Sequence, residues 1–330
     1  MKLCLRPDGS DQCGVGRSFN STVILLIDGL RFDFAEWDGS VDPLNTPHYL
    51  NKMPVFRDLM EGPHPAFLSR FVADAPTTTA QRLKALVTGG LPTFIDLASN
   101  FDSARLEEDN IVSQLHNAGR NVTVLGDDTW LKMFPEGLTT HALFPSFDVR
   151  DLDSVDAGIM RHLHASLAAM GTPEWEAGGL LVAHFLGVDH AGHRFGPSHP
   201  KMARKLEQMN DIVRSVAVSL PPSTLLLVLG DHGMTTSGDH GGDSSLETNA
   251  ALFAHWKDED ESVTSEQRPV YPAVVQQVSL VPTLALLLGV PLPFSSVGAV
   301  VPQLLPPPRR LPALRANVRQ VSVALQFFRN

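Results

Sequence analysis

The chain has 330 residues, of which 43% are hydrophobic and 19% are charged. This composition is globular, supplies enough apolar surface for a large buried core, and excludes a wholly disordered protein. The formal net charge of -10 argues against binding of a phosphate backbone as the main activity, because nucleic-acid binders need clustered Lys and Arg. We therefore expect no nucleic-acid partner.

The first 21 residues form a polar leader without the apolar core of a signal peptide. No run along the chain reaches the ~18 apolar residues that a membrane-spanning helix needs, so the chain is predicted to be soluble. Both cysteines, Cys4 and Cys13, lie in the leader, so no disulfide organises the predicted core. The sequence does not decide whether the two cysteines form a disulfide with each other. Asn20 and Asn121 begin Asn-X-Thr patterns, which matter only in a secreted or lumenal chain.

Four short apolar runs predict strands that are buried on both faces of a parallel sheet. They cover residues 22–28, 121–128, 179–189 and 223–231. Helical patterns occur at 79–89, 107–119 and 199–220, and alternating strands and helices indicate right-handed crossovers. We therefore expect an α/β fold, a three-layer sandwich with a mostly parallel central sheet.

A single catalytic domain is expected over residues 22–305. The acidic run KDEDES at 257–262 predicts a solvated loop. The segment LLPPPRRLP at 304–312 predicts an extended linker, so residues 306–330 are expected to hold a linker and an amphipathic helix. The apolar face of that helix would need a partner or a membrane surface.

Three of the four predicted strands run directly into an aspartate. Asp28 ends the first, Asp189 the third and Asp231 the fourth. In open α/β sheets ligands bind outside the carboxyl ends of the strands, so these carboxylates are expected to converge on one crevice. Taken alone, the pair Asp28-Gly29 is better explained as an ordinary turn. Only the repeated placement of aspartates at three strand ends indicates a metal site.

Three histidines accompany the aspartates. His193 follows Asp189 by four residues, His232 follows Asp231 directly, and His240 comes eight residues later. Three carboxylates and three imidazoles suffice for two zinc ions, and this mixture favours Zn²⁺ over Mn²⁺ or Mg²⁺. Two neighbouring zinc ions can hold the attacking and the leaving oxygens of a phosphoryl displacement.

Three other polar residues near this set are interpreted differently. His184 lies within an apolar run and is expected to be a satisfied core histidine. His190 could be a metal ligand, a substrate contact or a surface residue, and a role other than metal ligation is favoured. Asp239 is expected to orient His240 or its loop, also without binding a metal.

The run Thr77, Thr78, Thr79 stands where a helix is predicted to begin. A hydroxyl at that place can be deprotonated beside zinc, while the helix N-terminus offers backbone N–H groups to a phosphate. Without the predicted metal ligands, N-capping of the helix would explain these threonines better than a role as nucleophile.

Four motifs together resemble the alkaline phosphatase superfamily, in the branch with a threonine nucleophile: LLIDGLRFD, PTTTAQRLKALVTG, HFLGVDHAGHRFGP and LGDHGMTTSGDHGGDS. Within it, LPTFIDLASNF, GDDTW and FPSFDVRDLD resemble the GPI ethanolamine phosphate transferases, in the group that acts on the third mannose. The resemblance spans roughly residues 22–305.

The resemblance implies two sets of metal ligands. One zinc would be held by Asp28, Thr79, Asp231 and His232, and the other by Asp189, His193 and His240. It also implies that Thr79, ten residues before Gly89, is the nucleophile, with Thr78 as the alternative. Ala80 departs from the Met expected beside the nucleophile.

The resemblance further implies transfer of phosphoethanolamine from phosphatidylethanolamine to a mannose of the GPI precursor, through a phosphothreonine-type intermediate. It implies a lumenal location in the endoplasmic reticulum and a small membrane-protein subunit that stabilises the enzyme. Family members carry membrane anchors, which this sequence does not display. Two alternatives stay open: a zinc-dependent phosphodiesterase or pyrophosphatase that hydrolyses nucleotide or lipid diesters, and an inactive truncated isoform that acts as a binding domain.

Overall fold

The computed structural model describes residues 15–42, 46–91, 105–146, 148–257 and 271–329. Its centre is an eight-stranded sheet with the strand order β4-β3-β5-β1-β6-β7-β2-β8. The strands are β1 (Ser21–Ile27), β2 (Ala66–Val72), β3 (Asn121–Asp127), β4 (Thr140–Phe144), β5 (Gly179–Phe185), β6 (Thr224–Leu229), β7 (Asn249–Trp256) and β8 (Val274–Gln276). Among these strands, β7 alone runs antiparallel to its neighbours, so the predicted mostly parallel sheet is confirmed.

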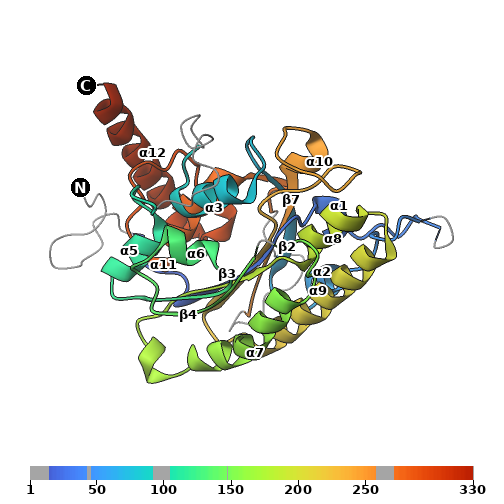
Figure 1. Cartoon of the computed structure of the whole chain (residues 1–330). Coiled ribbons are helices and arrows are strands. Elements are labelled where there is room, and N and C mark those ends of the chain that lie inside the picture. The colour runs from blue at the N-terminus through green and yellow to red at the C-terminus, as the bar shows by residue number, and fades with distance from the viewer. Residues whose placement is uncertain (1–14, 43–45, 92–104, 147, 258–270, 330) are drawn as a thin grey trace.

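Helices cover both faces of the sheet (Figure 1). One face carries α1 (Phe32–Ala35), α2 (Val55–Glu61), α7 (Ser154–Ala169), α8 (Gly187–Phe195) and α9 (Pro200–Ser219). The other carries α3 (Thr79–Thr88), α5 (Ile111–Asn117), α6 (Thr129–Met133), α11 (Leu280–Leu288) and α12 (Pro307–Arg329). The short elements are α10 (Ser245–Thr248), η1 (Pro173–Trp175), η3 (Gln277–Ser279) and η4 (Pro302–Leu304). The predicted three-layer sandwich is confirmed.

Strand β1 lies at the centre of the sheet and contributes to two separate cores. Leu25 and Ile27 pack with the α7 and α9 side, whereas Ile24 and Leu26 pack with the α3 and α11 side. Successive side chains of a strand point to opposite faces, so a strand covered on both faces is apolar at consecutive positions instead of alternate ones. This requirement explains the continuous apolar runs in the sequence.

The third predicted strand, 179–189, is too long, because β5 ends at Phe185 and α8 begins at Gly187. The buried carboxylate of Asp156 accepts hydrogen bonds from the backbone N–H groups of Leu186 and Gly187 at 3.0 and 3.2 Å. Lys205 Nζ lies 3.2 Å from the same carboxylate. These contacts fix the turn from strand to helix, and an apolar pattern does not reveal them.

The predicted linker at 304–312 is wrong from Pro307 onward, because α12 begins there. Proline is tolerated in the first turn of a helix, where a backbone N–H has no intrahelical partner. The helix is held further along by Gln320, whose side-chain amide donates to the carbonyls of Phe294 and Ser296 at 2.8 and 2.9 Å. Tertiary contacts of this kind decide where the helix runs.

None of the helices in the described part of the chain combines the length and the apolar character needed to cross a bilayer. Cys4 and Cys13, residues 258–262 of the acidic run and residues 92–101 of the LPTFIDLASNF motif lie outside the described residues.

Replacing Leu26 by Ala is expected to lower the free energy of unfolding by about 2 to 5 kcal/mol, because it opens a cavity in the central strand. The side chain is 1% exposed. Denaturant unfolding measures the change. The matched control is Val218→Ala on α9, where the side chain is 75% exposed and the change should stay within about 0.5 kcal/mol. Equal losses in the two variants would contradict the described core.

Candidate active site

Three adjacent parallel strands deliver aspartates to one edge of the sheet. Strands β5, β1 and β6 are neighbours, and each is followed at its carboxyl end by an acidic residue. Asp28 follows β1, Asp231 lies two residues after β6, and Asp189 lies in the first turn of α8 after β5. All three are buried. The convergence expected from the sequence is therefore present.

The six expected aspartate and histidine ligands fall into two groups, and within each group one side-chain ligand atom per residue lies within 4.8 Å of the others. The first group is Asp28, Asp231 and His232, and the second is Asp189, His193 and His240. We call them the inner group and the outer group, because the inner one is fully buried and the outer one is partly exposed. The resemblance divides these six residues in the same way and adds Thr79 to the first set.

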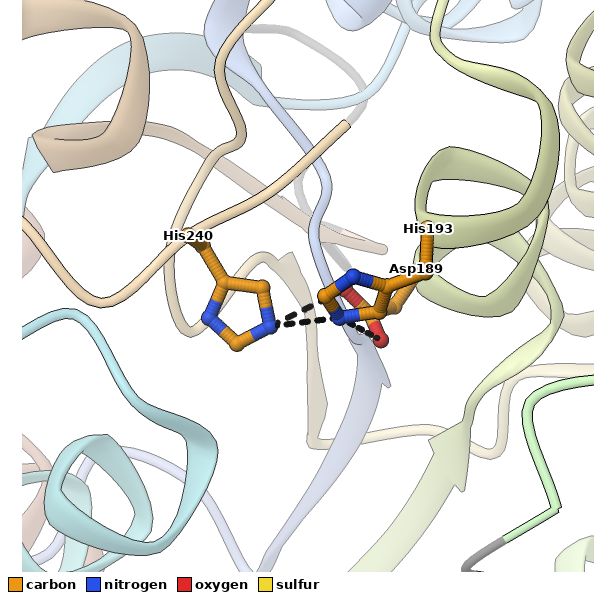
Figure 2. Close-up of side chains that lie close together, drawn as sticks. All are labelled: Asp189, His193 and His240. Carbon is orange, nitrogen blue, oxygen red and sulfur yellow. Dashed lines mark hydrogen bonds and ion pairs between the residues drawn. The ribbon is translucent and has the colours of Figure 1, made fainter. Parts of the chain in front are cut away.

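The two groups adjoin through His240. Its ring stacks on that of His232 with the centroids 3.8 Å apart. Its Nε2 atom lies 2.9 Å from His193 Nε2 and 3.5 Å from Asp189 Oδ1. Figure 2 shows the His193 and His240 side chains approaching from α8 and from the loop before α10, with Asp189 beside them. The groups are close enough to act on one substrate group.

Backbone carbonyls orient two of the imidazoles. His232 Nδ1 lies 2.8 Å from the Gly233 carbonyl, and His240 Nδ1 lies 2.7 Å from the Thr77 carbonyl. A carbonyl only accepts, so each Nδ1 carries a proton and each Nε2 keeps its lone pair in the neutral ring. This is the arrangement that metal-binding histidines use.

The carboxylates contain oxygens that the protein leaves unsatisfied. Asp28 Oδ1, Asp189 Oδ1 and Asp231 Oδ2 are buried and have no hydrogen-bond partner among the described residues. Burial, and then the neighbouring Asp231 carboxylate, hold the pKa of Asp28 well above its ordinary value. Buried charges of one sign need a counter-charge, and mixed carboxylate and imidazole donors suit zinc. The residues present therefore fit a divalent metal centre.

The three threonines have different surroundings. Thr77 is fully buried, and its hydroxyl accepts from Gly241 N at 2.9 Å and donates to the Gly242 carbonyl at 2.8 Å. It joins the His240 loop to the start of α3. The buried Thr78 hydroxyl has no hydrogen-bond partner among the described residues. Thr79 Oγ1 lies 3.2 Å from His232 Nε2, so this hydroxyl faces the inner group.

A second connection holds the His240 loop. Glu247 accepts from the backbone N–H of Gly242 at 2.7 Å and of Ser244 at 3.2 Å, and from the Ser244 hydroxyl at 2.5 Å. Ser244 and Glu247 form a capping box at the start of α10. We missed this pair in the sequence, although the Ser-X-X-Glu spacing is the usual signal for it.

His184, His190 and Asp239 belong to neither ligand group. His184 is fully buried between Trp130 and Asp28, at 3.1 and 3.3 Å. His190 Nδ1 lies 2.8 Å from the Asp151 carbonyl. Asp239 accepts from the Ser237 hydroxyl within its own loop at 2.9 Å. Asp239 Oδ1 also lies 3.9 Å from Nδ1 of His193. The sequence had suggested His240 or its loop as the contact of Asp239.

Solved structures share this fold. The chain superposes on wild-type alkaline phosphatase PafA with a TM-score of 0.60, at 11% identity, covering 87% of this chain and 99% of that one. It superposes on the C-terminal periplasmic domain of EcEptC from Escherichia coli, in complex with Zn, with a TM-score of 0.58, at 14% identity and 84% coverage of each chain. The chain therefore shares its fold with both of these proteins.

The family is given by the sequence itself. A model of the family described as type I phosphodiesterase / nucleotide pyrophosphatase matches residues 22–258. The chain belongs to this family.

Curated relatives are similar over most of this chain. One from Homo sapiens, named GPI ethanolamine phosphate transferase 3, catalytic subunit, is 50% identical over 296 residues, which are 88% of this chain and 26% of the relative. One from Schizosaccharomyces pombe, named GPI ethanolamine phosphate transferase 3, is 40% identical over 298 residues, which are 89% of this chain and 31% of the relative. The chain spans less than a third of the length of these relatives.

Replacing Asp28 by Asn is expected to stabilise the metal-free chain by on the order of 1 to 3 kcal/mol at neutral pH, because it removes one of several crowded carboxylates. The same change should abolish stabilisation by added zinc. Since the folded-state pKa of Asp28 is raised, its contribution to wild-type stability is full below the ordinary aspartate pKa of ~3.9 and is lost as pH rises through the raised value. Denaturant unfolding against pH, with and without zinc, measures both effects.

The control for this variant is Asp239→Asn, which alters a carboxylate whose side chain is 74% exposed. It should leave the zinc-dependent stabilisation in place. If Asp28→Asn kept that stabilisation, or if Asp239→Asn lost it, the ligand groups described above would be wrong.

Proposed function

We propose that the chain is the catalytic domain of a phosphoethanolamine transferase that acts on the GPI-anchor precursor. The observation that carries this proposal is the 3.2 Å distance between Thr79 Oγ1 and His232 Nε2, which aims one hydroxyl of the threonine run at the inner group. The names of the relatives with 50% and 40% identity supply the substrate class.

The inner group, together with Thr79, would hold one zinc ion, and the outer group would hold a second. Bound zinc supplies positive charge that lowers the pKa of the Thr79 hydroxyl and neutralises phosphoryl oxygens as charge develops on them. Mn²⁺ or Mg²⁺ suits this donor set less well, because three of its six carboxylate and imidazole donors are imidazoles.

In the first half of the proposed reaction, Thr79 Oγ attacks the phosphorus of phosphatidylethanolamine. The Oγ–P bond forms, the bond from phosphorus to the diacylglycerol oxygen breaks, and diacylglycerol leaves with a proton equivalent to the one that Thr79 loses. The product on the chain is phosphoethanolamine esterified to Thr79. The first turn of α3 presents backbone N–H groups without helical partners beside this phosphoryl group.

In the second half, the 6-hydroxyl of a GPI mannose attacks the same phosphorus. The bond from phosphorus to Thr79 Oγ breaks, the threonine regains a proton, and the sugar carries the phosphoethanolamine. The loop with His240 is held to the start of α3 by the Thr77 hydroxyl, so nucleophile and outer group keep a fixed spacing through both halves. Such positioning is a large part of phosphoryl-transfer catalysis.

The acceptor is proposed to be the third mannose, and the place of action the lumen of the endoplasmic reticulum. The resemblance of the sequence motifs to the transferase 3 group supports both proposals, and the names of the relatives agree with that group. The human relative is named as a catalytic subunit, which supports the further proposal of a stabilising membrane-protein partner.

A hydrolytic phosphodiesterase is the second candidate, and the description of the matching family favours it. The same residues would serve, with water in place of the sugar hydroxyl. Incubation of the chain with phosphatidylethanolamine labelled in the ethanolamine group, with and without a mannosyl acceptor, separates the two. The transferase should label the acceptor, whereas release of free phosphoethanolamine without labelled sugar would overturn the proposed function.

Replacing Thr79 by Ala is expected to reduce transfer by about 10³-fold or more, because no other group of the inner site can form the ester. The zinc content should stay close to that of the wild type, since carboxylates and imidazoles remain. Mass spectrometry of peptides from wild-type chain quenched with donor alone should find phosphoethanolamine on Thr79. Thr78→Ala is the control and should keep most of the activity; the opposite order of effects would move the nucleophile to Thr78.

A further inference from the structure

A buried hydrogen-bond relay leads from the indole of Trp130 to Asp28. His184 of β5 is 0% exposed and sits between them. Its Nδ1 lies 3.1 Å from Trp130 Nε1 on α6, and its Nε2 lies 3.3 Å from Asp28 Oδ2. The relay therefore joins three elements, α6, β5 and the end of β1, behind the inner group.

The chemistry of the indole fixes the direction of this relay. An indole N–H can only donate, so the Trp130 contact requires an unprotonated Nδ1 on His184. The imidazole is then neutral with its proton on Nε2, and it donates to Asp28 Oδ2.

This hydrogen bond to one oxygen of Asp28 leaves the other oxygen to face the inner group. Asp28 Oδ2 accepts the hydrogen bond from His184 Nε2–H. Asp28 Oδ1 has no hydrogen-bond partner among the described residues and lies 3.3 Å from His232 Nε2. The carboxylate is thus held with one oxygen toward the relay and the other toward the inner group.

A competing acceptor shows why the indole matters. Asp127 Oδ2 lies 3.8 Å from His184 Nδ1. Without the indole N–H, the ring proton could move to Nδ1 and face Asp127, and the Nε2 lone pair would then face the Asp28 carboxylate. Two electron-rich groups would oppose each other beside the inner group, so Trp130 selects the tautomer that the site needs.

His184 also differs from the histidines of the two ligand groups. His232 and His240 use Nδ1 on a backbone carbonyl and keep Nε2 for ligation. Both nitrogens of His184 are engaged within the protein. Its place in the fold is that of a donor to a ligand.

We propose that His184 is a positioning residue, locked as the Nε2–H tautomer by Trp130, that turns Asp28 Oδ1 toward the metal of the inner group. This proposal rests on the proposed function in that Asp28 must be a metal ligand. It requires no assumption about the phosphoryl acceptor.

Zinc affinity of the full chain, measured by competition with a chromophoric chelator, tests the positioning role. His184→Leu should weaken binding about 10- to 100-fold, the usual effect of losing a hydrogen-bond partner of a metal ligand. Trp130→Phe keeps a ring in the core and should weaken binding about tenfold. His184→Gln, whose amide can accept from the indole and donate to Asp28, should restore most of the affinity.

The matched control is His255→Gln. His255 is a buried histidine of β7 whose pKa is lowered by burial to about 4, and its Nδ1 contacts the Pro65 carbonyl instead of a ligand residue. It should bind zinc as the wild type does. Equal weakening in His255→Gln would show general loss of structure and would overturn the positioning role.

Nitrogen-15 shifts of the histidine rings in the metal-free wild-type chain give a readout that does not depend on any variant. They should place the His184 proton on Nε2, and a proton on Nδ1 would overturn the proposal. So would wild-type zinc affinity in folded His184→Leu, or a wild-type chain that takes up no zinc. A wild-type chain that transfers no phosphoethanolamine, while His184→Leu still weakens zinc binding, contradicts the proposed function and supports the relay.

Discussion

The structure around the site depends on the burial of three carboxylates at one edge of the sheet. Asp28, Asp189 and Asp231 each have one oxygen without a hydrogen-bond partner among the described residues. Burial, and then the neighbouring Asp231 carboxylate, raise the pKa of Asp28. Neighbouring buried carboxylates repel one another, so the fold carries a local electrostatic strain that a cation relieves. Histidine Nε2 atoms face the same space. A metal centre accounts for both features together.

The scaffold holds this arrangement rigid from several directions. Parallel strands set the spacing of the aspartates, and Asp156 fixes the turn that carries Asp189. Thr77 and Glu247 tie the loop of His240 to the rest of the site. Loops alone would leave ligands mobile, whereas these buried and partly buried hydrogen bonds fix ligand orientation before any substrate binds.

The sequence predicted the sandwich and the convergence of the aspartates and histidines at one sheet edge, because strand ends and residue types are local signals. It could not separate Thr77, Thr78 and Thr79 by pattern, since their different roles arise from contacts with residues far along the chain. It treated His184 as core, because an apolar run does not show what lies beside it. The antiparallel β7 and the start of α12 at Pro307 depend in the same way on tertiary packing.

The central claim is that cations compensate the buried carboxylates. Anomalous diffraction at the zinc absorption edge, from crystals of the full chain grown with zinc, tests it most directly. The account predicts two peaks, one in contact with Asp28, Asp231 and His232 and one in contact with Asp189, His193 and His240. No peak at either group, with the carboxylates still buried and crowded, would contradict it.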